Sequence, residues 1–163
     1  MQQTETSQAV TAWRQLYLTY SAIFKAIERS IAPTGVTLPQ ALALNTIRYG
    51  EGPMTPSRLA HYLTQETQSV TGLIDRMERQ GWVRRVRDLP DRRAIRLELT
   101  DAGTHKLEDT SGPGFETTEQ MFSRLKPEEL EQLISLLGRV YLGAMEQLGR
   151  ETALPGTTTA VPS

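Results

Sequence analysis

The chain has 163 residues, of which 38% are hydrophobic and 6% aromatic, and its formal net charge is −1. These values predict a mainly helical soluble protein rather than an aromatic-rich β-sandwich. The absence of cysteine excludes a disulfide scaffold, a cysteine nucleophile and a thiolate zinc site. Because the chain has only two histidines, we expect no metal site and no cofactor, although carboxylates could complete a metal site. Since no apolar run is long enough to cross a bilayer and the first residues do not resemble a secretory leader, we expect a cytoplasmic protein without membrane contact.

Two helices are predicted at the start of the chain. From about residue 8 to 30, apolar side chains recur at three- and four-residue steps, as on one face of an amphipathic helix. The breakers at 33–35 end that helix. Thr37 and Gln40 then have the spacing of a capping box, and they open a second helix that ends near residues 50–53.

A third and a fourth helix follow. Thr55 before Pro56 is a typical start for a short helix, because threonine caps the first turn and proline suits its first position. Residues 66–80 present apolar side chains on one face only, and Gly81 is well suited to end that helix.

The next segment alternates apolar and polar residues, as two short strands would. Residues 82–86 and 95–99 form the alternating runs, and Pro90 with Asp91 supplies the turn between them. We therefore predict a β-hairpin directly after the fourth helix.

The last third of the chain is again helical. Thr100 caps a helix in which residues 111–114, Ser-Gly-Pro-Gly, predict a kink or break. Pro127 starts a final amphipathic helix with carboxylates at its positive end. From residue 151 onward, threonine, proline and glycine predict a disordered tail.

A basic segment overlaps the fourth helix and the hairpin. Residues 76–96 contain eight arginines against three carboxylates, although the whole chain is slightly acidic. Such a basic face is typical of a protein that binds a polyanion. Arginine on an exposed strand often only protects the strand edge, which would explain one or two of the six between 84 and 96. An ion pair of Asp91 with Arg93 is an alternative to DNA contact for one of the turn arginines.

The outer face of the fourth helix carries short hydrogen-bonding side chains near its N-terminal end. A helix that reads base edges in the major groove needs such side chains, although alone they would indicate an ordinary solvated face. The adjoining basic hairpin favours DNA, because phosphate contacts orient a reader helix. Our candidate DNA-binding residues are Thr67, Gln68, Ser69, Thr71, Arg76, Arg87, Arg92 and Arg93.

Several short motifs occur together in this order: Leu59-Ala60, Val70-Thr71, Leu73-Ile74-Asp75-Arg76-Met77-Glu78, Gly81-Trp82-Val83-Arg84-Arg85, Asp91-x-Arg93-x-x-x-Leu97 and Leu99-Thr100-x-x-Gly103. Over about residues 10–150 the chain thereby resembles the MarR family of bacterial transcription regulators. The resemblance implies a mainly α fold with a small β wing, a winged helix-turn-helix with N- and C-terminal dimerisation helices. It also implies a homodimer on double-stranded DNA with a palindromic operator, and a small-molecule pocket between the dimer and DNA-binding regions.

The resemblance also divides the chain. Residues 1–35 correspond to an N-terminal dimerisation helix, 36–100 to the winged helix-turn-helix and 101–150 to the C-terminal dimerisation helices, with 151–163 as the tail. Gly72 departs from the pattern, since a larger polar residue is common there, and glycine costs about 1 kcal/mol of helix propensity relative to alanine.

An effector site is a further hypothesis. Trp13, Tyr17, Tyr20 and Phe24 form one stripe of the first helix, and Arg48 could meet an anionic group, which together suit a small aromatic or anionic effector. Aromatics at helical spacing more often form a core, so a role in the dimer core is the stronger alternative.

The leading interpretation is a sequence-specific DNA-binding transcription regulator, a homodimeric repressor released by a small-molecule effector. Apolar stripes on both terminal helices, which one small domain cannot bury, favour the dimer independently. The alternative is a winged-helix protein-interaction module without DNA readout. We predict no catalytic residues, because the chain lacks a phosphate-cradling glycine loop, a nucleophile elbow and a paired metal motif.

Overall fold

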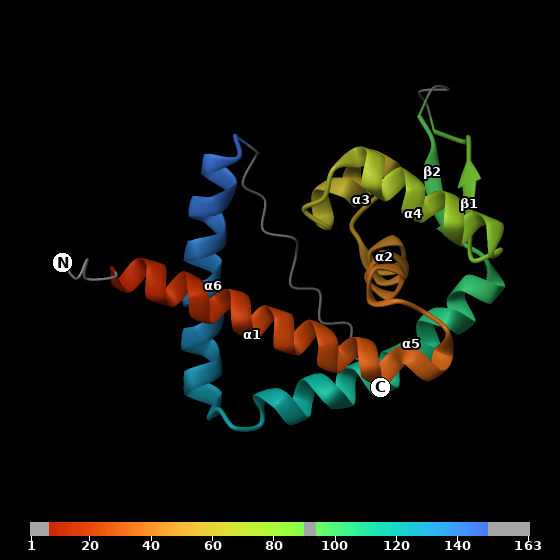
Figure 1. Cartoon of the computed structure of the whole chain (residues 1–163). Coiled ribbons are helices and arrows are strands. Elements are labelled where there is room, and N and C mark those ends of the chain that lie inside the picture. The colour runs from red at the N-terminus through yellow and green to blue at the C-terminus, as the bar shows by residue number, and fades with distance from the viewer. Residues whose placement is uncertain (1–6, 90–93, 150–163) are drawn as a thin grey trace, which may run out of the picture.

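The computed structural model describes residues 7–89 and 94–149. Six α-helices and two strands occur in these ranges (Figure 1): α1 (Gln8–Ile31), α2 (Leu38–Tyr49), α3 (Pro56–Tyr62), α4 (Thr67–Arg79), β1 (Val83–Val86), β2 (Arg96–Leu99), α5 (Asp101–Phe122) and α6 (Pro127–Gln147), with a short 3₁₀ turn, η1 (Ala32–Thr34), after α1. The mainly helical fold with a two-stranded wing is as predicted. In the described ranges, no helix is both long and apolar enough to span a membrane.

The helix starts confirm the predicted caps. Thr37 and Gln40 form the capping box of α2, and the side chains of Thr55 and Thr100 accept hydrogen bonds from the first turns of α3 and α5. Gly81 follows α4 with a φ of +73°, a left-handed conformation that glycine adopts without strain. Local sequence signals therefore determine most of the element boundaries.

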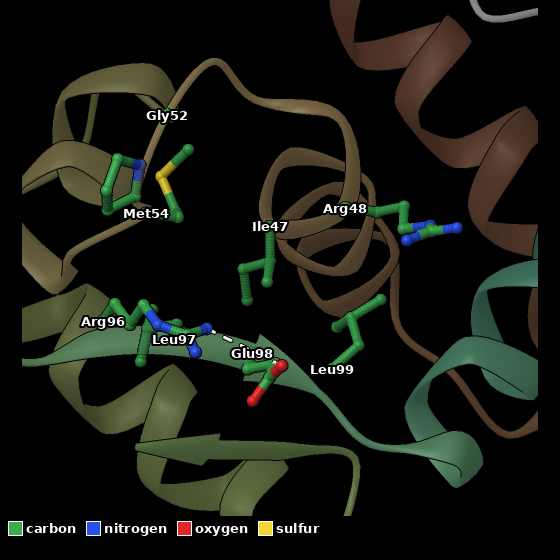
Figure 2. A pocket seen from close by; sticks show the side chains of 9 residues that line it. Ile47, Arg48, Gly52, Met54, Arg96, Leu97, Glu98 and Leu99 are labelled. Carbon is green, nitrogen blue, oxygen red and sulfur yellow. Dashed lines mark ion pairs between the residues drawn. The ribbon is translucent and has the colours of Figure 1, made fainter. Parts of the chain in front are cut away.

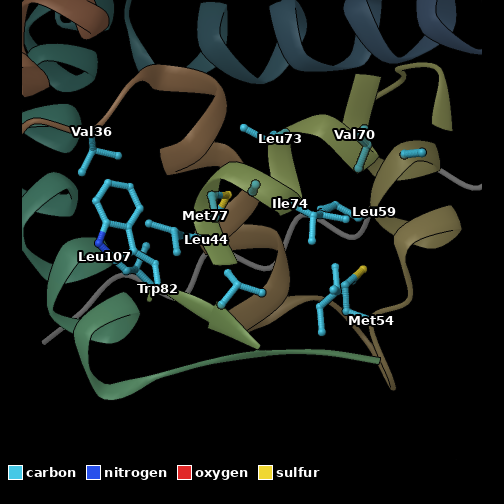
Figure 3. Packing of buried hydrophobic residues seen from close by; sticks show 14 residues of the cluster. Val36, Leu44, Met54, Leu59, Val70, Leu73, Ile74, Met77, Trp82 and Leu107 are labelled. Atoms are coloured by element: carbon cyan, nitrogen blue, oxygen red, sulfur yellow. The ribbon is translucent and has the colours of Figure 1, made fainter. Parts of the chain in front are cut away.

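One hydrophobic core joins α2, α3, α4 and the wing (Figure 3). Leu44, Leu59, Val70 and Ile74 are fully buried where the three helices meet. Val83 extends the same core to the first strand. Because α4 buries one face here, its opposite face is held outward in a fixed orientation.

The wing is an antiparallel pair with Val83 opposite Leu99 and Val86 opposite Arg96. Leu97 of β2 is buried, and its backbone N–H donates to the carbonyl of Met54 at 2.7 Å. This bond ties the wing to the loop before α3. The predicted turn at Pro90 and Asp91 lies outside the described residues.

Of the kink or break predicted at residues 111–114, the break is wrong, because α5 runs without interruption from Asp101 to Phe122 with Pro113 inside it. Proline normally clashes with the side chain of the residue before it, and here that residue is Gly112, which has none. Gly114 faces α1: a Cβ there would lie 3.8 Å from Cγ2 of Ile31. Packing of α1 along α5 thus supports the helix where its own backbone is weakest.

Both terminal helices expose apolar side chains. On α1, Trp13 is 64% exposed and Tyr17 60%, and on α6, Ile134 is 59% exposed and Val140 58%. Figure 1 shows α1, α5 and α6 extending away from the winged-helix unit. Exposed apolar stripes on two long helices are unusual for a monomer and mark an interaction surface.

Candidate nucleic-acid interface

The outer face of α4 presents the predicted polar residues. Thr67, Gln68, Ser69 and Thr71 are all exposed, while Val70 and its neighbours on the inner face are buried. The hydroxyl of Thr71 donates to the carbonyl of Thr67 at 2.8 Å. Thr71 therefore offers outward a methyl group and acceptor lone pairs, whereas Gln68 keeps both a donor and an acceptor.

Among the arginines of the basic segment that the structure describes, three are held in ion pairs. Arg84 binds Glu98 across the strands at 2.8 Å, and Arg96 binds Asp88 at 2.6 Å. Arg85 forms ion pairs with Asp75 and Glu78 of α4. Structural pairing thus accounts for more of the cluster than the one or two arginines that edge protection would explain.

Arg85 connects the wing to α4. Its guanidinium binds Asp75 at 2.6 Å and forms a second ion pair with Glu78, and Glu78 also accepts from the Arg85 backbone N–H. Partial burial opposes the charge of Arg85, but the hydrogen bond to Asp75 and the charge of Glu78 outweigh it and raise its pKa. The wing and the outer face of α4 are thereby held in one fixed relation.

A second pair lies at the outer end of the strands, where Asp88 accepts hydrogen bonds from Nε and Nη2 of Arg96. These hydrogen bonds lower the pKa of the Asp88 carboxyl below its usual 3.8, against the opposing effect of desolvation. Because the folded-state pKa is depressed, the pair stabilises the fold above the unfolded pKa and is lost as pH falls through the folded value.

We expect Arg96→Gln to return the pKa of Asp88 toward 3.8, because the hydrogen bonds that favour its charged form are removed. A carboxyl NMR titration measures this directly. Arg79→Gln is the control, since Arg79 is directed to the carbonyl of Asp75 and not to Asp88 or Arg96, and it should leave the Asp88 titration unchanged. The same Asp88 midpoint in Arg96→Gln and the unmodified protein would contradict the assigned pair.

Other arginines remain available to a partner. Arg76 on α4 and Arg87 after β1 are exposed and form no ion pair with any residue in the described ranges. Arg79 directs its Nε to the carbonyl of Asp75. The predicted contacts of Arg92 and Arg93, and the pairing of Arg93 with Asp91, lie outside the described residues.

The junction of α4, the wing and α5 was not predicted. The Thr100 hydroxyl donates to the carbonyl of Gly81 at 2.6 Å and accepts from the N–H of Gly103. Gly103 packs so closely that a Cβ there would lie 1.9 Å from the carbonyl oxygen of Trp82. The motif Leu99-Thr100-x-x-Gly103 had marked both residues, and glycine is otherwise unfavourable in the first turn of a helix, but neither signal indicated the contact with Trp82.

The candidate effector residues lie in two places. Trp13 stacks on Tyr17 with ring centroids 6.3 Å apart, and Tyr20 contacts Phe24 at 5.9 Å, all along α1. Arg48 instead lines a pocket of about 240 Å³ between α2, the loop at 52–54 and β2, and none of the four aromatics lines that pocket. Figure 2 shows the Arg48 side chain extending away from Ile47 and Met54.

Comparisons with known proteins agree with this geometry. The family model described as "MarR family" matches residues 34–94. The uncharacterized HTH-type transcriptional regulator YkoM of Bacillus subtilis is 30% identical over 139 residues, which cover 83% of this chain and 90% of YkoM. The transcriptional repressor MprA of Escherichia coli is 27% identical over 132 residues, 79% of this chain and 75% of MprA.

Among solved structures, a mutant MarR from E. coli complexed with operator DNA has a TM-score of 0.74 and 23% identity, covering 82% of this chain and 95% of that one. That likeness shows the same fold. The winged helix, the motifs along it and the near full-length match to YkoM together establish that the chain belongs to the MarR family, as its motifs predicted.

Proposed function

We propose that this protein is a homodimeric, sequence-specific DNA-binding repressor that a small-molecule effector releases from its operator. The observation that carries the proposal is the outward face of α4: an exposed row of short polar side chains on a rigid core, next to a wing that the Arg85 pairs hold in place. A helix of this kind fits the major groove, and an adjoining hairpin reaches the neighbouring backbone. YkoM and MprA carry the names of a transcriptional regulator and a repressor, which supports the same function.

The candidate residues have two roles, contact with base edges and electrostatic attraction to the DNA. Thr67, Gln68, Ser69 and Thr71 on α4 would contact base edges. Arg76, Arg87, Arg92 and Arg93 would supply positive charge toward the DNA. Residues 36–100 would therefore form the DNA-binding region, and we assign no catalytic role to the chain.

Dimerisation would use the terminal helices. Val10, Trp13 and Tyr17 of α1 and Ile134 and Val140 of α6 are exposed in a single chain, and a second copy related by two-fold symmetry would cover them. Residues 1–35 and 101–150 would thus hold two winged helices at a fixed separation, which suits a palindromic operator.

The effector proposal has two separate parts, because the α1 aromatics do not line the pocket that Arg48 lines. An aromatic ligand would stack on Tyr20 or Phe24, and an anionic group would bind Arg48, which forms no ion pair among the described residues. Aromatics nearer the start of α1, such as Trp13, would then belong to the dimer core.

The proposal is tested by a gel shift with the DNA upstream of the protein's own gene. A salt-sensitive complex that a scrambled duplex of equal length does not compete away is the expected result. Equal competition by both duplexes would instead favour the alternative, a winged-helix module that binds proteins and does not read DNA.

Gln68→Ala and Arg87→Ala should have different effects on DNA binding. The Gln68 amide can form a bidentate pair with adenine that is worth about 1–3 kcal/mol of discrimination, so its loss should relax preference at one position of each half-site. Arg87 offers only charge to the DNA backbone. Its loss should therefore weaken binding to all sequences alike and reduce the salt dependence of the binding constant by about one per subunit. A binding-site selection and a salt titration for both variants measure the two effects. If the two variants behaved alike, or each showed the effect expected of the other, the roles assigned to Gln68 and Arg87 would be contradicted.

A further inference from the structure

Gly72 stands in the middle of the outer face of α4, one position after Thr71. A glycine at this place leaves a gap in the row of side chains that the helix would present to DNA. Helix propensity does not favour it there, and its φ is not in the left-handed range, so the backbone does not require it.

The side chain of Arg76 borders this gap. A Cβ built on Gly72 would lie 3.9 Å from Nη1 of Arg76, and no other atom outside the helix backbone would come within 4 Å. Side chains four residues apart lie on the same helix face, and long ones lean toward the helix N-terminus. The guanidinium of Arg76 is therefore carried back about one turn, to the level of the predicted base readers.

The charge of that guanidinium is not neutralised by its neighbours. The two carboxylates nearest to it along α4, Asp75 and Glu78, are both bound by Arg85 of the wing. Arg79 is directed to the carbonyl of Asp75. Within the described residues Arg76 forms no ion pair, and its side chain is exposed, so all its donors are available to a ligand.

We propose that Arg76 reads a guanine in each half-site, reaching it across Gly72. The planar fork of an arginine matches the O6 and N7 acceptors of guanine in the major groove, and a helix without a side chain at residue 72 leaves that fork an open approach. The inference rests on the proposed DNA-binding function and names one base that the protein selects.

The test is binding-site selection from a randomised duplex pool, using the full-length protein and Arg76→Lys. Lysine keeps the charge but cannot form the bidentate fork. We expect the unmodified protein to select a guanine at one position per half-site, and Arg76→Lys to reduce that preference about tenfold while the salt slope stays the same. Arg79→Lys is the matched control on the same helix and should retain the guanine.

Two variants of Gly72 test the gap itself. Gly72→Ala adds a methyl group at an ordinary contact distance from Arg76 and should leave the selected sequence unchanged. Gly72→Leu fills the space beneath the guanidinium and should reduce the guanine preference as Arg76→Lys does. Thermal melting and light scattering on each variant confirm that fold and assembly are retained.

An unchanged guanine preference in Arg76→Lys or in Gly72→Leu overturns this inference alone, because the protein still selects DNA. A reduced salt slope with an unchanged base profile in Arg76→Ala also overturns it and makes Arg76 a phosphate contact. Failure of the unmodified protein to select any sequence overturns the proposed function, and the inference with it.

Discussion

Gly103→Ala is expected to destabilise the fold by about 3 kcal/mol, the upper part of the range for overpacking a close contact. The added Cβ would lie 1.9 Å from the carbonyl oxygen of Trp82 and 2.8 Å from its carbonyl carbon. These are backbone atoms that cannot rotate away, so α5 must move from the base of the wing. Loss of the Thr100 hydroxyl contact with Gly81 would follow. A thermal melt should show a midpoint lower by roughly 10 °C.

Gly114→Ala on the same helix is the matched control. A methyl group there would meet Ile31 and Ile27 of α1 at 3.8 and 4.0 Å, ordinary contact distances, so the change should stabilise the protein by up to about 1 kcal/mol. Equal melting midpoints for Gly103→Ala and Gly114→Ala would contradict the close packing of α5 on the wing.

Val140→Glu is expected to convert the dimer to a monomer. Val140 is 58% exposed in one chain and belongs to the apolar face of α6 that a second copy would cover. Burying an unpaired carboxylate costs about 3 kcal/mol or more, which raises the dissociation constant roughly 100-fold or more. Light scattering at micromolar concentration measures the change. Affinity for the operator should fall when the dimer is lost, because two monomers then bind the two half-sites independently.

Ser135→Glu adds the same charge to α6 between its exposed polar neighbours Glu131 and Arg139, and it should leave a dimer. A folded monomer in the unmodified protein would refute the dimer outright. A fully dimeric Val140→Glu protein would show that α6 does not form the interface.

Local signals in the sequence predicted most of the fold. Capping residues such as Thr37, Thr55 and Thr100 act on the turn that follows them, so the helix starts follow from neighbouring residues alone. The continuity of α5 could not be predicted in this way. Gly112 before Pro113 removes one local clash, but the packing of α1 on Gly114 comes from a distant part of the chain.

The sequence predicted which side chains of α4 face outward but not the partners of the wing arginines. The polar face of α4 is a periodic pattern and can be recognised in the sequence. The partners of Arg85 and Arg96 depend on how the wing lies against α4, which no local pattern encodes. The sequence also associated Arg48 with the α1 aromatics, whereas in the structure it lines a pocket beside β2.

Two copies of this chain are expected to place two α4 helices in successive major grooves of a palindromic operator. A hydroxyl-radical footprint on the selected operator tests it most directly. We expect two protected regions related by two-fold symmetry, with centres about 10 base pairs or a multiple of that apart and therefore on one face of the duplex. A single protected region of one half-site, or uniform protection that does not depend on sequence, would contradict it.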